Sequence, residues 1–254
     1  MTNLVLASLF LPLSHFGLSS SRLRSLLAER LGERRFLLLY QVITLIAFAW
    51  LIAAYRTTPR HIIWSAPPAL RLVILPLVLL AFVLVVAAVT TPNPVIVGSA
   101  HLFELERGVV VRGILRVSRN SFFWGVGLWG LAHAAGSGEL AGVLMFGTIA
   151  ALALIGAPVL DAKKAAQYGS RWNTFAEVTS SVPFVAIAQG RQRLVLTEIG
   201  WWRLVVAIVL FLAALYGHRW AFGVSPLPRW DHPYLECSAD PRSGVPGGLH
   251  AIPS

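Results

Sequence analysis

Six long runs of apolar residues constrain what this chain can fold into. They cover residues 4–20, 36–55, 70–91, 121–135, 140–160 and 201–220. A helix that crosses the hydrocarbon core of a bilayer needs about 20 such residues, and the runs lack the two-residue alternation of an outer-membrane β-barrel. The sequence therefore predicts an all-α, polytopic integral membrane helix bundle of about six transmembrane helices. Pro12 and His15 interrupt the first run and the fourth is short and glycine-rich, so five or seven helices are the alternatives.

The composition excludes several other classes of protein. Hydrophobic side chains make up 56% of the 254 residues and charged side chains only 13%, whereas a soluble domain is roughly one-quarter charged. This balance excludes a disordered chain, an ordinary nucleic-acid-binding module and a typical cytosolic enzyme. The single cysteine, Cys237, excludes a disulfide framework, an iron–sulfur cluster and a four-cysteine zinc site. We expect one transmembrane domain over residues 1–222, followed by an irregular Pro- and Gly-rich tail over 223–254.

The net charge of +10 predicts an orientation in the membrane. Five Lys or Arg residues fall in 21–35, four in 92–120 and five in 161–200, so these three loops hold fourteen of the 21. Because basic loops tend to stay in the cytoplasm, we expect these loops to be cytoplasmic and both termini to lie outside. A cleaved signal peptide is the alternative for the first run, but no Lys or Arg precedes that run and no A-x-A-like site follows it.

Ionisable side chains are costly inside a span and are candidates for function, and we single out three of those in the apolar runs. They are His15, His133 and Arg203. We expect Arg203 to extend from the start of the last run to the lipid headgroups. Each histidine alone is explained by a hydrogen bond to a neighbouring helix, but two imidazoles on separate helices can also clamp a haem iron. Asp161 neighbours two lysines, which favours a solvated charge cluster.

Several short stretches carry a family resemblance. They are Arg112-Gly-Ile-Leu-Arg116-Val-Ser-Arg119, Leu128-Trp-Gly-Leu-Ala-His133, Asp161-Ala-Lys-Lys with Tyr168-Gly, Thr179-Ser-Ser-Val-Pro183-Phe184, and His15 followed by an Arg-rich segment. Through these stretches the chain resembles the NnrU family. The resemblance covers roughly residues 4–222, and the matching residues are most closely spaced over 107–191. NnrU proteins are bacterial inner-membrane proteins associated with denitrification and nitric-oxide metabolism. The related 15-cis-zeta-carotene isomerases of plants and algae share the pattern, including a match at His101-Leu102-Phe103-Glu104.

The resemblance implies a protein of the bacterial inner (plasma) membrane that binds haem b. In the isomerases, the histidine of the early helix and that of the L-A-H motif are the proposed axial ligands, and these positions match His15 and His133. The isomerases also place a cysteine three residues before the second histidine, where this chain has Gly130. The family commonly reads Arg-His-Pro where this chain has Arg119-Asn120-Ser121. Both departures weigh against isomerase chemistry.

The expected topology sets the two histidines at different depths. His15 lies towards the cytoplasm and His133 towards the outside, a difference on the order of 10 Å. A bis-histidine iron needs both nitrogens at one depth, which requires a tilted or shifted first helix. On depth alone, His133 would meet His61 or His218, and His15 would meet His101. We expect His15 and His133 as the cofactor- and metal-binding pair because the resemblance supports them.

Three functions are compatible with these observations. The first is a NnrU-like haem b protein of nitric oxide and denitrification metabolism, which would take a small gaseous ligand. The second is a haem-dependent carotenoid isomerase of the 15-cis-zeta-carotene type, which would take a hydrophobic polyene. The third is a cofactor-free structural or transport membrane protein whose histidines serve helix packing. In all three the lipid bilayer is the expected partner, and no nucleic acid is expected.

Overall fold

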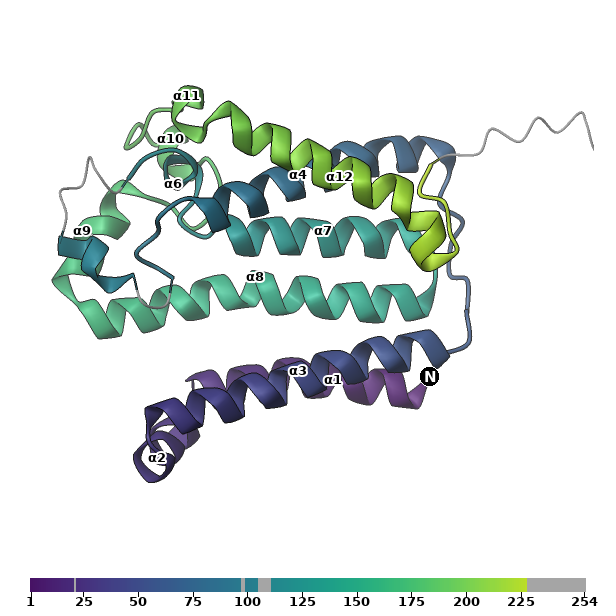
Figure 1. The fold of residues 1–254 in the computed structure, drawn as a ribbon, viewed down its shortest axis with the longest axis horizontal. Coiled ribbons are helices and arrows are strands. Elements are labelled where there is room, and N and C mark those ends of the chain that lie inside the picture. Colours follow the sequence, from purple (N-terminus) through teal and green to yellow (C-terminus); the bar gives the residue numbers. More distant parts are fainter. Residues whose placement is uncertain (21, 97–98, 105–110, 228–254) are drawn as a thin grey trace, which may run out of the picture.

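A computed structural model describes residues 1–20, 22–96, 99–104 and 111–227. Six long helices fill most of it, and the described residues contain no extended strand beyond one isolated bridge, between Ile62 and Glu139 (Figure 1). The long helices are α1 (Thr2–Ser20), α3 (Glu33–Thr57), α4 (Pro68–Thr90), α7 (Ser121–Ser137), α8 (Leu140–Tyr168) and α12 (Trp201–Phe222). Each corresponds to one of the six apolar runs, so the predicted all-α bundle is confirmed.

The lengths of the helices suit a membrane. Five of them, α1, α3, α4, α8 and α12, are long and apolar enough to cross a bilayer. Helix α7 has 17 residues, at the lower limit of what spans the hydrocarbon core. The chain is therefore a multi-pass membrane protein. The predicted tail begins where α12 ends, and its residues from 228 onwards, including Cys237, lie outside the described residues.

The short helices gather at one end of the bundle, which we name the basic end because the three basic loops lie there (Figure 1). They are α2 (Arg22–Leu31), η1 (Ala100–Glu104), α6 (Ile114–Val117), α9 (Ser170–Val178), α10 (Val185–Ala188) and α11 (Leu196–Ile199). The opposite end holds the N-terminus, the loop 58–67 and the turn between α7 and α8. The two ends therefore differ in charge and in structure.

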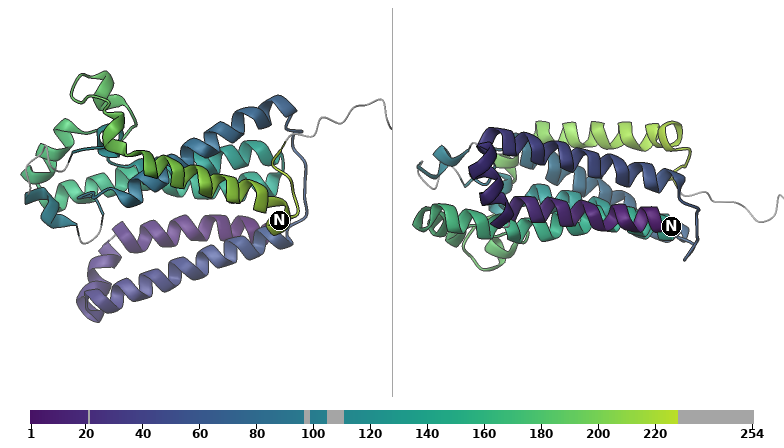
Figure 2. Two further views of the ribbon diagram at one scale, coloured as in Figure 1. Left: turned by 45° about the horizontal axis from the view of Figure 1, so that its top comes forward. Right: turned by 90° about the horizontal axis from the view of Figure 1, so that it is seen from below.

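Helices α4, α7 and α8 form the centre of the bundle. Helix α7 packs between α4 and α8, the hairpin of α1 and α3 packs on α8 through α1, and α12 packs on α4 (Figures 1 and 2). Small residues allow α7 and α8 to approach closely: a Cβ built on Gly130 would lie 2.8 Å from the carbonyl oxygen of Phe146 and 3.0 Å from the Cβ of Ala150. Close packing of small residues drives helix association in lipid, where helices gain little from the hydrophobic effect.

The turn after α7 is fixed by the loop 58–67. Gly138 adopts a left-handed conformation with φ 64°, and its carbonyl oxygen accepts hydrogen bonds from the backbone N–H groups of Ile63 and Trp64 at 2.7 and 3.1 Å. A Cβ at this position would lie 2.1 Å from the carbonyl oxygen of Trp64. Glycine is required here both for the conformation and for the contact.

Helix α12 packs on α4, and its hydrogen bonds to that helix lie at its first turn. Arg203 donates to the side-chain oxygen of Thr90 at 2.8 Å and to its carbonyl oxygen at 3.0 Å. Thr90 is the last residue of α4, so the guanidinium binds a helix C-terminus, where carbonyl groups lack partners and a positive charge is favoured. The prediction that Arg203 extends to the headgroups misses this contact with α4. Of the described residues of α12, Ala207 alone is buried, and the apolar side chains of this helix face outwards.

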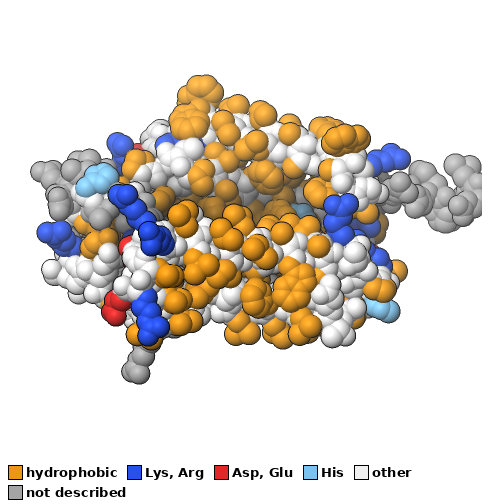
Figure 3. All heavy atoms as spheres, turned by 60° about the horizontal axis from the view of Figure 1, so that its bottom comes forward, with side chains coloured by type: hydrophobic (Ala, Val, Ile, Leu, Met, Phe, Trp, Pro, Cys, Tyr) orange, Lys and Arg blue, Asp and Glu red, His pale blue; other side chains and the backbone are white. Residues whose placement is uncertain are grey.

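Apolar side chains also cover the middle of the face seen in Figure 3, while Lys and Arg lie towards the two ends. This distribution is that of a protein whose middle faces lipid and whose ends face water and headgroups.

The close approach of α7 to α8 generates a prediction. Gly130→Ala should lower the free energy of unfolding by about 1–3 kcal/mol, because the added methyl group collides with the backbone of α8. Gly147→Ala is the matched control on α8, since nothing lies within 4 Å of a Cβ there, and it should be neutral or slightly stabilising. Denaturant titration of both variants in detergent micelles would measure the difference. Equal effects of the two substitutions would contradict the proposed packing role of Gly130.

Candidate functional site

The structure places His15 on α1, in the half nearer the basic end. The hydroxyl oxygen of Tyr40, on α3, lies 3.0 Å from Nδ1 and 3.0 Å from Nε2 of this imidazole. The ring of Phe16 lies edge-on to it, with centroids 5.6 Å apart. The hydroxyl therefore faces the edge of the ring between the two nitrogens, and His15 ties α1 to α3.

His133 lies on α7, in the half nearer the opposite end. Its Nδ1 is 2.8 Å from the carbonyl oxygen of Trp129. A carbonyl oxygen only accepts, so Nδ1 carries the proton in this hydrogen bond and the neutral ring keeps its lone pair on Nε2. The rings of Trp129 and Phe146 lie with centroids 4.4 and 5.1 Å from that of His133. His133 thus has an oriented ring, aromatic neighbours and one nitrogen free to act as a ligand.

The structure does not bring these two histidines together. The carbonyl oxygen of Ser19, one turn beyond His15, accepts a hydrogen bond from Lys163 near the end of α8, whereas His133 contacts Phe146 near the start of α8. Helices α1 and α8 run in the same direction (Figure 1). At 1.5 Å per residue, and allowing for the turn between His15 and Ser19, the two imidazoles differ in depth by roughly 20 Å.

The other histidines divide between the two ends. His218, on α12, lies within electrostatic range of His133, and the carbonyl oxygen of His61 accepts from the backbone of Leu140 at the same end. His101 lies in η1 at the basic end and is exposed. Within the described ranges, no group of three or more His, Cys, Asp or Glu side chains is placed to hold a metal ion.

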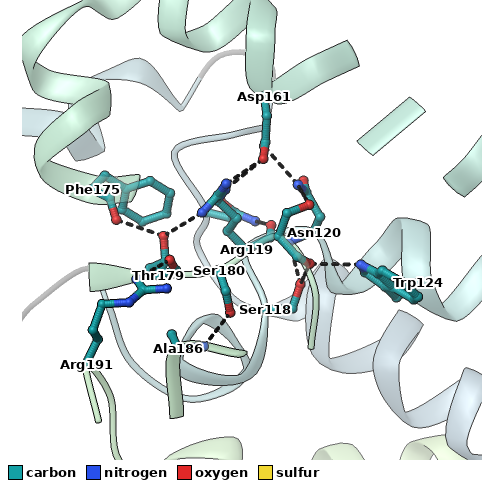
Figure 4. A network of polar contacts seen from close by, with 12 residues as sticks. Ser118, Arg119, Asn120, Trp124, Asp161, Phe175, Thr179, Ser180, Ala186 and Arg191 are labelled. Atoms are coloured by element: carbon teal, nitrogen blue, oxygen red, sulfur yellow. Dashed lines mark hydrogen bonds and ion pairs between the residues drawn. The ribbon is translucent and has the colours of Figure 1, made fainter. Parts of the chain in front are cut away.

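A second candidate site, a network of buried and half-buried polar side chains at the basic end, was not predicted (Figure 4). Arg119 donates to Oδ2 of Asp161 through Nη2 at 2.6 Å and through Nε at 3.0 Å. The two side chains are 12% and 15% exposed. Asn120 donates to the other carboxylate oxygen of Asp161 at 2.8 Å and to the hydroxyl of Ser181 at 2.9 Å. The expected solvated cluster of Asp161 with its neighbouring lysines is therefore wrong.

This network, which we name the Arg119 network, continues into the loop after α9. The carbonyl oxygen of Ser181 accepts from the hydroxyl of Ser118 at 2.6 Å and from the indole of Trp124 at 2.8 Å. Asn120 is 2% exposed, and its Oδ1 has no hydrogen-bond partner. The network thus joins the start of α7, the end of α8 and the loop 179–181.

A bidentate ion pair lies at the same end. Nε and Nη2 of Arg116 donate to the two carboxylate oxygens of Glu198 at 2.7 and 2.9 Å, and the backbone N–H of Gly113 donates to the same carboxylate at 2.8 Å. These hydrogen bonds, chiefly the one from Arg116, lower the pKa of Glu198 below its ordinary value. The carboxylate in turn raises the pKa of Arg116. The pair ties α6 to α11, just before α12 begins.

The bundle of membrane-length helices and the polar network at one end define the class of protein as a multi-pass helical membrane protein. The model of one family, described as NnrU protein, matches residues 3–226, and the chain belongs to this family. Among curated proteins and solved structures, none matches the chain. Three of the stretches that carry the family resemblance, around Arg119, at Asp161 and over 179–184, meet in the Arg119 network.

The haem implied by the resemblance can be tested against the two histidines. A bis-histidine iron needs one nitrogen from each side of a single metal, and side chains roughly 20 Å apart in depth do not fit that arrangement. The Tyr40 hydroxyl also faces both ring nitrogens of His15. His133 alone fits the role of a single axial ligand, because its second nitrogen is held by a backbone carbonyl as ligating histidines commonly are.

The buried position of Asp161 generates a prediction. Asp161→Asn should lower the free energy of unfolding by about 3 kcal/mol, because it leaves the Arg119 charge buried without its counter-ion. The matched control is Glu139→Gln at the opposite end, where the partner Arg60 is 48% exposed; loss of that exposed pair should cost less than about 1 kcal/mol. Denaturant titration in micelles would compare them. A control variant as unstable as Asp161→Asn would contradict the special role of the buried pair.

The lowered pKa of Glu198 predicts a pH dependence. Its ion pair stabilises the fold fully above the ordinary pKa of 4.5, and this contribution disappears as the pH falls through the lower pKa of the folded state. Glu198→Gln should therefore be less stable than the wild type at pH 7, and the difference in Tm should shrink as the pH is lowered below about 4.5. Thermal unfolding between pH 3 and pH 7 would measure it. A difference in Tm that stays constant over this range would contradict the contribution of the carboxylate.

Proposed function

We propose that this NnrU-family protein binds haem b through His133 and serves in nitric oxide and denitrification metabolism. The hydrogen bond from Nδ1 of His133 to the Trp129 carbonyl oxygen carries this proposal, because it leaves Nε2 with the lone pair that a ferrous or ferric iron requires. Haem held by His133 would supply an iron that can bind a small gaseous ligand.

The protein's own residues prepare this position. The carbonyl of Trp129 fixes the tautomer and the orientation of the imidazole. The rings of Trp129 and Phe146, 5.4 Å apart, lie against it. The ring of Tyr55, from α3, lies 6.0 Å from that of Phe146, so α3, α7 and α8 all contribute to the aromatic surroundings.

The proposal includes a location and an orientation. We place the protein in the bacterial inner membrane with the basic end in the cytoplasm and both termini outside, following the distribution of Lys and Arg. His133 then lies in the outer half of the membrane.

Absorption spectroscopy of the protein purified after haem-sufficient expression tests the proposal. The wild type should show a Soret band, and His133→Ala should lose it. His15→Ala should keep it, because Tyr40 and the depth of His15 separate this residue from the His133 site; His101→Ala serves as an exposed control.

The absence of a Soret band in the wild type would contradict haem binding. Loss of the band in His15→Ala as well as in His133→Ala would contradict a single axial histidine. Conversion of 15-cis-zeta-carotene by the haem-loaded protein under reducing conditions would favour the isomerase function over the nitric-oxide function.

A further inference from the structure

The corner where α1, α2 and the end of α8 meet carries an unbalanced positive charge. Nζ of Lys163 donates to the carbonyl oxygen of Ser19, the residue before the last of α1, at 2.5 Å. A lysine ammonium has three N–H donors, so this hydrogen bond leaves two of them for a ligand. Lys163 is itself exposed. Its position is therefore fixed by the protein while its charge remains accessible.

Two further cations surround Lys163. Arg24, on α2, and Lys164 both lie within electrostatic range of its ammonium group. Lys164 is 7% exposed, and its Nζ lies 5.2 Å from the centre of the Tyr168 ring. The amino group of Lys164 is therefore held against an aromatic face rather than in solvent.

The acidic groups nearby leave the charges of Lys163 and Lys164 without a counter-ion. Glu33 binds Arg24 at 2.5 Å, and Asp161 is bound to Arg119 on the other side of α8. Among the ion pairs of the described residues, none includes Lys163 or Lys164. The corner consequently attracts an anion.

The position of the corner favours a lipid as the source of that anion. Helix α8 has 29 residues and is about 43 Å long, which exceeds the roughly 30 Å hydrocarbon core, so its last turns reach the headgroup region. Helix α2 joins α1 to α3 at this level and exposes Leu23, Leu26 and Leu31 beside its charged residues. A short helix with apolar and basic side chains lies at the boundary between headgroups and acyl chains.

We propose that this corner binds the phosphate group of an anionic phospholipid. Lys163 donates to the phosphate with its remaining N–H groups. Arg24 donates with the guanidinium N–H groups that Glu33 leaves free. Lys164 contributes electrostatically without contacting the phosphate. The exposed leucines of α2 contact the acyl chains of the same lipid. The site is independent of the proposed haem site, which lies towards the other end of the bundle.

Native mass spectrometry of the full-length protein tests this proposal, using phosphatidylglycerol and phosphatidylcholine with identical acyl chains. The wild type should retain phosphatidylglycerol in preference to phosphatidylcholine. Lys163→Gln should weaken this retention about fivefold, the effect of roughly one basic side chain at an anionic membrane surface. Lys163→Arg should restore it. Arg34→Gln, which removes one exposed cation at the start of α3, is the matched control and should retain the lipid.

Three results would overturn the proposal. Equal retention of phosphatidylglycerol by Lys163→Gln and the wild type would show that this corner is not the site. Equal losses in Lys163→Gln and Arg34→Gln would show a general effect of surface charge. Displacement of the lipid by millimolar inorganic phosphate would show a site for the free anion. Circular dichroism of each variant verifies that it is folded.

Discussion

The ion pair between Arg119 and Asp161 is the interaction on which the basic end of the bundle depends. It joins the residue two positions before α7 to a carboxylate on α8, across a contact from which water is largely excluded. A buried charge pair contributes little net stability over apolar side chains of the same size, but the loss of one partner is costly. Its contribution is therefore to fix which surfaces of α7 and α8 face each other. Asn120 and Ser181 extend this constraint to the loop after α9, so the start of α7, α8 and this loop are held in fixed positions relative to one another.

The close packing of α7 on α8 complements this pair. Gly130 brings the two backbones together near the opposite end, and the ion pair aligns them at the basic end. Because α7 is also packed on α4, the central three helices form one packed unit. The α1–α3 hairpin packs on this unit through α8, and α12 packs on it through α4. The aromatic surroundings of His133 lie within this unit, whereas the corner around Lys163 lies where the hairpin meets it.

The sequence predicted the helices well because a membrane helix is determined by local apolar content. Helices α7, α8 and α12 begin at the first residues of the corresponding apolar runs, 121, 140 and 201. The end of α8 was predicted less well. The apolar run stops at 160 and the helix continues to Tyr168, since hydropathy does not register helical residues in the headgroup region.

The Arg119 network could not be predicted, because it depends on segments distant in sequence. Asp161 and Lys163 are neighbours in the chain, but two residues turn a helix by about 200°, so they face α7 and α1 respectively. The separation of His15 from His133 was anticipated from topology, and the structure increases it.

Helix α12 packs mainly on one neighbour, α4, and its hydrogen bonds to that helix lie at its first turn, so it is less constrained than the central helices. Arg203 fixes its first turn to the end of α4, while almost all of its remaining surface faces outwards. The tilt of such a helix is set by the thickness of the surrounding bilayer as much as by its protein neighbours. A thicker or thinner membrane would thus move the far end of α12, near Trp220, while leaving the guanidinium contact in place. The helix would couple the geometry of the lipid phase to the half of the bundle away from the basic end, where His218 of α12 lies within electrostatic range of His133.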